Sequence, residues 1–284
     1  MKITILEPRG YCAGVNQAIE MALTARKNHP LLMVNVLGML VHNSYVIAFL
    51  KQHDIGLIKN IHEAPNGSAI IFTAHGHENK DEQIAKEKNL VIYDAICPLV
   101  KKNLATIAKE KENHHQVIYI GYPSHPETLA AISSNTNVYL YSIGQTFDYN
   151  VISDASPLII NQTTLNILSL ENIHQDIKNH LPKARLQDEI CRATRNRQEA
   201  LLQLEEDVDA IIVVGSEKSS NAKRLYEIAQ SVHPQVDAFL IESATELPKE
   251  ILKTKRHIVI SSSASAPLSL IEEISNELVN LKQL

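Results

Sequence analysis

Residues 209–232 read DAIIVVGSEKSSNAKRLYEIAQSV. The run 209–214 is rich in β-branched residues and stops at Gly215, and a polar loop then leads into a segment of helical length. A short apolar run with these borders favours a buried strand. The stretch therefore predicts a strand, a loop and a helix in succession, which is the repeating unit of parallel α/β sheets.

The same succession recurs in each third of the chain, which predicts an α/β fold of similar small domains with parallel sheets around a common centre. The predicted strands are residues 3–6, 32–37, 68–72, 90–93, 116–120, 157–160, 209–214 and 257–260. The predicted helices are residues 15–27, 81–88, 98–112, 165–181, 195–205 and 221–232.

Composition excludes several classes of function. The chain has 284 residues, a net charge of −5 and no tryptophan, so it lacks the strongly basic face of nucleic-acid binders. Neither a signal peptide nor an apolar run long enough to cross a bilayer is visible. Three widely spaced cysteines without a secretory signal argue against a disulfide framework. We therefore expect a cytoplasmic protein with a small polar substrate and no membrane or nucleic-acid partner.

The three cysteines, Cys12, Cys97 and Cys191, fall one to each third, each beside a loop that opens a helix. A helix N-terminus stabilises a thiolate, which is the metal-binding form of cysteine. A shared three-thiolate site is one interpretation, and three unrelated cysteines in small buried niches are the other. Three thiolates are too few for a closed zinc site or for the usual four-cysteine iron–sulfur set, so either another group completes the coordination or one metal position stays open.

Nearly every predicted strand is followed by a loop of reactive polar residues. Ligands of open α/β sheets bind at the carboxyl ends of the strands, so these loops predict one convergent site. Histidines His42, His75 and His125 are candidate donors to phosphate oxygens. Glu127 is a candidate proton donor or an ordinary first-turn helix charge. Residues 215–221 and Ser265-Ala266-Pro267 are candidate anion cradles at helix starts, without the ending of a nucleotide P-loop.

Nine short motifs, in this order along the whole chain, resemble those of the 4-hydroxy-3-methylbut-2-enyl diphosphate reductases. They are Arg9-Gly10-Tyr11-Cys12-Ala13-Gly14-Val15, Val41-His42-Asn43, Thr73-Ala74-His75-Gly76, Cys97-Pro98-Leu99-Val100, His125-Pro126-Glu127, Gln162-Thr163-Thr164-Leu165, Asn196-Arg197-Gln198-Glu199-Ala200, Ser219-Ser220-Asn221 and Ala264-Ser265-Ala266-Pro267. The chain departs from the family's usual residues at Asn16-Gln17, Ile96, 101–104, Tyr122 and Ser263.

The resemblance implies three α/β domains around a central [4Fe–4S] cluster. We expect the domains at residues 1–97, 98–190 and 191–284, with the C-terminal segment packing back on the first. Cys12, Cys97 and Cys191 match the cluster ligands, and the open iron takes the substrate's allylic hydroxyl. Groups that match the family's diphosphate-binding and substrate-binding residues are His42, His75, His125, Thr163, Ser219, Ser220, Asn221 and Ser265.

The implied reaction is the last step of the non-mevalonate isoprenoid pathway. Two electrons enter from the cluster, Glu127 matches the proton donor, and Thr163 and His125 complete the catalytic set. The products are isopentenyl and dimethylallyl diphosphate. The alternatives are a non-catalytic iron–sulfur sensor or diphosphate-binding regulator and, less favoured, a zinc hydrolase.

The electron donor is expected to be a ferredoxin or a flavodoxin. The basic residues Lys101, Lys102, Arg192, Arg195 and Arg197 lie near two of the cysteines and are either its docking surface or ordinary solvated helix charges.

Overall fold

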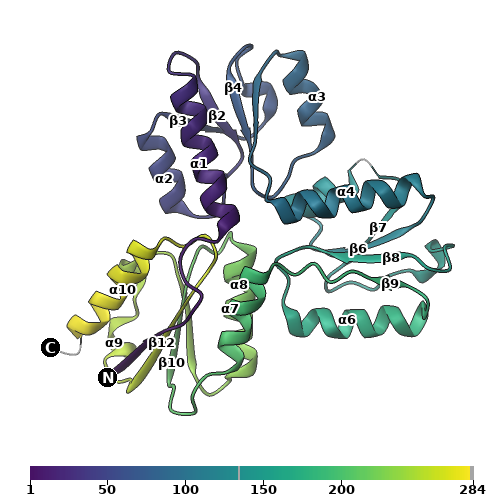
Figure 1. The fold of residues 1–284 in the computed structure, drawn as a ribbon. Coiled ribbons are helices and arrows are strands. Elements are labelled where there is room, and N and C mark those ends of the chain that lie inside the picture. The colour runs from purple at the N-terminus through teal and green to yellow at the C-terminus, as the bar shows by residue number, and fades with distance from the viewer. Residues whose placement is uncertain (134, 282–284) are drawn as a thin grey trace. The chain divides into compact units, whose positions relative to one another are not determined.

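The structure, a computed structural model, describes residues 1–133 and 135–281. In these residues the strands alternate with helices along the chain and form three parallel four-stranded sheets (Figure 1). The strands are β1 (Lys2–Ile5), β2 (Val34–Leu37), β3 (Ile55–Ile58), β4 (Ala69–Phe72), β5 (Val91–Asp94), β6 (Val117–Gly121), β7 (Val138–Ser142), β8 (Leu158–Asn161), β9 (Arg185–Leu186), β10 (Ala210–Val214), β11 (Asp237–Ile241) and β12 (His257–Ser262). The helices are α1 (Ala13–Asn28), α2 (Ser44–Gln52), α3 (Asn79–Glu87), α4 (Pro98–Glu112), α5 (Pro126–Ile132), α6 (Ile167–His180), α7 (Arg192–Leu202), α8 (Ser220–Val232), α9 (Lys249–Leu252) and α10 (Leu268–Leu281). The predicted α/β fold class is confirmed.

The chain forms two compact units. The first contains residues 1–16, 41–48 and 191–284, and the second contains residues 17–40 and 49–190. The predicted boundaries at residues 97 and 190 stay a prediction, and residues 282–284 of the predicted third domain lie outside the described residues.

The sheet of the first unit has the strand order β1-β12-β10-β11. Its N-terminal strand pairs with β12, with Lys2 opposite His257, and Figure 1 shows the purple β1 beside the yellow β12. Residues along β10 alternate between two cores. One core holds Ile212 with α9 and α10, and the other holds Ile211 with α7 and α8. A strand that is buried on both faces has a continuous apolar sequence, which is why the sequence of residues 209–214 predicts a strand.

The second unit contains two sheets, with strand orders β3-β2-β4-β5 and β7-β6-β8-β9. In the first of these, Ile70 and Phe72 of β4 pack against Ala85 of α3. In the other, Val117 and Tyr119 of β6 pack with residues of α4, α5 and β8. The central strands β4, β6 and β8 are buried along their whole length, so the loops at their carboxyl ends are held by rigid strands.

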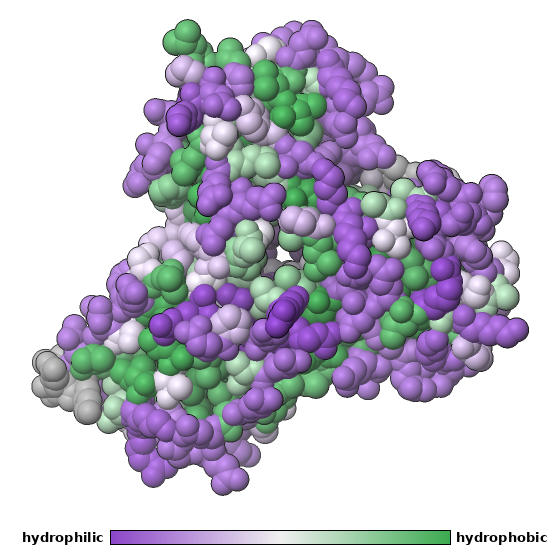
Figure 2. Space-filling model, viewed as in Figure 1, coloured by the Kyte–Doolittle hydropathy of each residue, from purple (hydrophilic) through white to green (hydrophobic). Residues whose placement is uncertain are grey.

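Figure 2 shows the hydropathy of one face of the molecule. On the face shown in Figure 2, hydrophilic side chains cover most of the surface and apolar ones are scattered between them. Across the described parts of the chain, no helix has both the length and the apolar character needed to span a bilayer.

Candidate functional site

Two of the three cysteines lie in the first unit. Cys12 directly precedes α1, and Cys191 is the N-cap of α7 without a side-chain capping hydrogen bond. Both are partly exposed, and neither is in a disulfide. Helix α7 begins at Arg192, so the predicted start at residue 195 was wrong by three positions. The side chains of Cys12 and Cys191 therefore lie at helix N-termini.

Arg197 joins the loops that carry these two cysteines. It is 3% exposed, and burial lowers the pKa of its guanidinium, whereas the nearby Cys12 and Cys191 raise it. The prediction that Arg197 offers a docking charge to a partner protein is therefore wrong, because the side chain is buried. Its three nitrogens donate to the backbone carbonyls of Gly10 (2.7 Å), Ala193 (2.9 Å) and Ser262 (3.0 Å).

Asn221 connects the predicted anion cradles to the cysteine loops. Its Oδ1 accepts a hydrogen bond from the Ala264 N–H at 3.0 Å, and its Nδ2 donates to the Thr194 hydroxyl at 2.9 Å. The N–H of Cys12 in turn donates to the Ala264 carbonyl at 3.0 Å. The buried amide of Asn221 thus joins the start of α8 to α7 and to the loop after β12, and Ala264 joins that loop to Cys12. Asn221 therefore has a structural role in addition to the predicted substrate contact.

The remaining predicted groups of the first unit lie on the same loops. Ser219 is the N-cap of α8, and its hydroxyl accepts a hydrogen bond from the Ala222 N–H at 3.3 Å. The hydroxyl of Ser265 lies 3.4 Å from that of Ser263. Burial, and then the charge of Lys218, lowers the pKa of His42, so this imidazole is neutral near pH 7. These donors at a helix N-terminus suit an anionic ligand.

Cys97 belongs to the second unit. It is the N-cap of α4, and its N–H donates to the Ala74 carbonyl at 3.0 Å, beside His75. The ring of His75 meets the ring of His125 edge to face, with centroids 5.7 Å apart. Gly76, at φ +94, lets its loop approach α5, because a Cβ there would lie 3.2 Å from the Cβ of Ala130. The structure thus brings Cys97, His75 and His125 onto adjoining loops.

His125 is fixed by the start of α5. Its Nδ1 accepts a hydrogen bond from the Glu127 N–H at 3.2 Å, so this nitrogen is unprotonated. In the neutral ring the proton is then on Nε2, which can donate to a phosphate oxygen. The capping bond also sets the position of Glu127 in the first turn of the helix.

Glu127 is 2% exposed, and Thr163 contacts both of its carboxylate oxygens. The Thr163 N–H donates to Oε1 at 3.0 Å, and the Thr163 hydroxyl donates to Oε2 at 2.9 Å. Burial raises the pKa of Glu127, the two bonds from Thr163 oppose it, and the result is a pKa of about 7. A carboxyl group that is half protonated near neutrality can both deliver and accept a proton.

This raised pKa predicts how stability depends on pH. A carboxyl group whose folded pKa lies above its ordinary value of 4.5 contributes stability below pH 4.5 and loses it as the pH rises through about 7. We expect the free energy of unfolding of the wild type to fall by about 3 kcal/mol relative to Glu127→Gln over that interval. Urea unfolding of both proteins at about pH 5 and pH 8 checks this. An unfolding difference that does not change with pH would contradict the buried carboxyl group.

A group of three potential metal ligands lies apart from the predicted site residues. Among residues 1–133 and 135–281, Glu205, Asp207 and His257 are the one set of at least three carboxyl, imidazole or thiol groups whose ligand atoms lie within 4.8 Å of one another. The Lys2 ammonium already pairs with Glu205 at 2.5 Å, and His257 bonds to Asp207 at 2.7 Å and to Thr4 at 2.9 Å. Glu205 and Asp207 precede β10 and His257 begins β12, so the three groups lie at the amino ends of these strands, opposite to the ends that carry the predicted site residues. The Lys2 ammonium is already present there as a cation.

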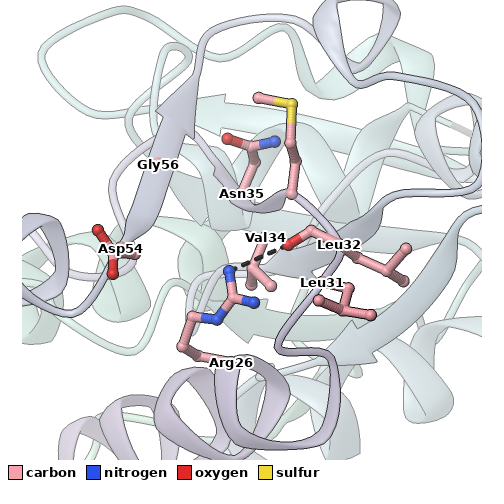
Figure 3. A pocket seen from close by; sticks show the side chains of 8 residues that line it. Arg26, Leu31, Leu32, Val34, Asn35, Asp54 and Gly56 are labelled. Atoms are coloured by element: carbon pink, nitrogen blue, oxygen red, sulfur yellow. Dashed lines mark hydrogen bonds between the residues drawn. The ribbon is translucent and has the colours of Figure 1, made fainter.

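Figure 3 shows a cavity of about 250 Å³ in the second unit, at the amino ends of β2 and β3. Its guanidinium, from Arg26, donates to the carbonyl of Leu32 at 3.0 Å and also bonds to His29. The Arg26 guanidinium therefore stabilises the turn between α1 and β2. None of the predicted site residues lines this cavity. A second cavity, also about 250 Å³, borders residues 215–218, but it includes Glu217, Glu242 and Glu246, which disfavour a diphosphate.

Comparison with known proteins identifies the family. The LytB protein family model matches residues 3–279. The 4-hydroxy-3-methylbut-2-enyl diphosphate reductase of Buchnera aphidicola subsp. Schizaphis graminum is 36% identical over 291 residues, covering 99% of this chain and 91% of that protein. The enzyme of the same name from Francisella tularensis subsp. novicida is 34% identical, covering 98% and 88%.

Two solved structures of reductases are also similar to this chain. The E-1-hydroxy-2-methyl-but-2-enyl-4-diphosphate reductase of Plasmodium falciparum superposes with a TM-score of 0.87 at 31% identity, covering 97% of this chain and 87% of that one. A structure of (E)-4-hydroxy-3-methyl-but-2-enyl diphosphate reductase, described as the terminal enzyme of the non-mevalonate pathway, gives a TM-score of 0.69 at 26% identity, covering 99% and 100%.

The sheets, the reactive loops at their carboxyl ends and these relatives together define an α/β oxidoreductase. The chain belongs to the LytB protein family, the family of the 4-hydroxy-3-methylbut-2-enyl diphosphate reductases.

Proposed function

We propose that the protein converts 4-hydroxy-3-methylbut-2-enyl diphosphate into isopentenyl and dimethylallyl diphosphate. The reaction breaks the allylic C–O bond and consumes two electrons and two protons. One proton leaves with the hydroxyl as water, and the other goes to either end of the allyl system. The observation that carries this proposal is Glu127, a buried carboxyl group with a pKa of about 7 that is held on both oxygens by Thr163.

Cys12, Cys97 and Cys191 are the residues that would hold a [4Fe–4S] cluster. All three are outside disulfides, partly exposed and placed at the starts of helices, and two of them lie near the buried guanidinium of Arg197. This donor set fits a cluster with one iron that lacks a protein ligand. When bound, the cluster supplies the electrons and a Lewis-acidic iron that makes hydroxide a better leaving group.

The diphosphate is held, in this proposal, by neutral hydrogen-bond donors. His42, with its pKa lowered, donates as a neutral imidazole, and His125 donates through Nε2 because its Nδ1 is occupied. Helix α8 adds the backbone N–H groups of its first turn. The further groups that we assign to this role are His75, Ser219, Ser220, Asn221 and Ser265.

Glu127 delivers the proton. Its neutral form is stable because the site is buried, and Thr163 holds the carboxyl group in one orientation while its own hydroxyl can relay a proton. Thr163 also orients the substrate in this proposal. His125 positions Glu127 through the capping bond and belongs to the catalytic set for that reason.

The test is an anaerobic assay of the purified protein with the hydroxylated diphosphate, dithionite and a viologen dye. We expect dye oxidation together with both five-carbon diphosphate products. An iron–sulfur protein that binds the diphosphate without forming product would contradict the proposal and favour a sensor. Zinc without iron or sulfide would favour a hydrolase instead.

We further propose a cytoplasmic location and an acidic ferredoxin or flavodoxin as electron donor. Exposed basic residues near the cysteines would attract such a partner, although Lys101 pairs with Asp94 at 3.5 Å and Lys102 with Glu189 at 2.9 Å. Arg192 is exposed and Arg195 is partly exposed.

Reduction by this donor is expected to slow as ionic strength rises, because salt screens attraction between exposed charges. Stopped-flow reduction at several salt concentrations measures the effect, with a cationic viologen as the control that shows no such slowing. A rate that is indifferent to salt would argue against charge-guided docking.

A further inference from the structure

Tyr119 is an aromatic residue of the core with a polar end that the fold leaves unused. The side chain, in β6, is 1% exposed and packs in the core with Ile107, Val117 and Leu158. Its hydroxyl makes no hydrogen bond of ordinary length and angle to any part of the chain that the structure describes. A buried hydroxyl without a partner is costly, and phenylalanine would fill the same space without that cost. The presence of tyrosine at this position therefore suggests a role for its hydroxyl.

Tyr119 packs in the same core as Ala131 of α5, the helix that carries Glu127. Burial, and then the charge of Glu127, raises the pKa of Tyr119, and Tyr119 in turn opposes the upward shift in the pKa of Glu127. Gly121 follows on the same face of β6 and leaves room for this approach. A Cβ at Gly121 would lie 3.0 Å from Cε1 of Tyr119 and 2.5 Å from Oγ1 of Thr128, the residue after Glu127.

The carboxylate of Glu127 can accept a further donor. Thr163 supplies one bond to each oxygen, whereas an ionised carboxylate has about four acceptor positions. At 2% exposure the group has almost no contact with water. Once Glu127 has released its proton, a negative charge remains in a buried site, and another donor would stabilise it.

Few other titratable groups face Glu127. His125 lies on its own helix and bonds to its N–H, and His75 contacts the His125 ring from the loop after β4. The end of β8 contributes Asn161, Gln162 and Thr163, which do not titrate in this range. Among residues 1–133 and 135–281, no lysine or arginine contributes to the shift in the pKa of Glu127, whereas the Tyr119 hydroxyl does. Tyr119 is therefore placed to compensate the charge.

We propose that Tyr119 is a positioning residue for Glu127: the Tyr119 hydroxyl donates a hydrogen bond to the carboxylate after the proton has been delivered, and so stabilises the charged group and holds it in place. Its value for catalysis rests on the proposed function, but the hydrogen bond itself can be measured without turnover.

The test compares wild type with Tyr119→Phe by infrared titration of the full-length, anaerobically purified protein. The protonated carboxyl band of Glu127 is identified by its absence from Glu127→Gln. Removing a hydrogen bond to the charged form raises the pKa, so we expect the acid dissociation constant of Glu127 to fall about threefold to tenfold in Tyr119→Phe. An unchanged titration midpoint would overturn the proposal.

Tyr141→Phe is the matched control. It removes a hydroxyl that bonds to Asp176 at 3.1 Å, in the neighbouring strand β7, and is expected to leave the Glu127 midpoint unchanged. If Tyr119→Phe does not fold, incorporation of 3-fluorotyrosine replaces it. Fluorination makes the phenol a stronger donor, so the midpoint should then fall, and an unchanged midpoint would again overturn the proposal.

Turnover separates this proposal from the proposed function. If the wild type is active, the alkaline limb of its pH–rate profile should move to higher pH in Tyr119→Phe. If the wild type is inactive and the infrared midpoint still shifts, the reductase assignment fails and the role of Tyr119 stands. A change in thermal stability without any shift in midpoint would indicate a packing role alone and contradict the proposal.

Discussion

Glu127→Gln is expected to keep the fold and the cluster and to lose about 100-fold to 10,000-fold of the turnover rate. Glutamine is close to isosteric and can still bond to Thr163, but it has no acidic proton to deliver. Turnover of the wild type should also fall as the pH rises through about 7, because the protonated form of Glu127 is then lost. Steady-state rates with a viologen dye between about pH 6 and pH 9 measure both effects.

Glu110→Gln is the matched control for this variant. Glu110 is also a buried carboxyl group of the second unit, but it pairs with Arg185 of β9 at the far end of α4 from Cys97. It is expected to retain turnover while losing some stability. Near-normal turnover in Glu127→Gln would remove Glu127 as the proton source, whatever the control shows.

Replacing any one of the three cysteines by serine is expected to remove most of the bound iron and sulfide and all measurable turnover. The chain contains three cysteines, so no spare thiolate can take over the lost position. Loss of residues that merely support metal ligands already costs about 10-fold to 100-fold in affinity, and loss of a ligand should cost more. Iron and sulfide determination after anaerobic purification gives the content of each variant.

Circular dichroism of the same preparations shows whether each serine variant keeps its secondary structure. One variant that folds, retains a full complement of iron and turns over substrate would show that its cysteine is not a ligand. That result would favour the simpler interpretation of an incidental buried thiol at that position.

The sequence predicted the parts of the fold that buried strands determine. Strands such as β4, β6 and β10 are covered on both faces and read as continuous apolar runs, so their positions were recovered within one residue. The strands β3, β7, β9 and β11 were missed. They lie at sheet edges, and most of their residues are only partly buried or exposed, which weakens the apolar pattern.

The candidate site was predicted as a set of residue types, because reactive loops after parallel strands are visible in a sequence. In the structure Glu127 bonds to Thr163 and the His75 ring meets the His125 ring, so these loops adjoin within the second unit. The burial of individual side chains could not be predicted from the sequence. Arg197 looks like a surface charge on a helix, and Tyr119 looks like any aromatic residue of a strand.

The joint action of the three cysteines stays a prediction, since Cys12 and Cys191 belong to one unit and Cys97 to the other. Mössbauer spectroscopy of anaerobically purified, ⁵⁷Fe-labelled protein tests it most directly. We expect a [4Fe–4S] spectrum in which one iron differs from the rest and shifts when the hydroxylated diphosphate is added. A spectrum without such a cluster, or with irons that are all alike and unaffected by the substrate, would contradict it.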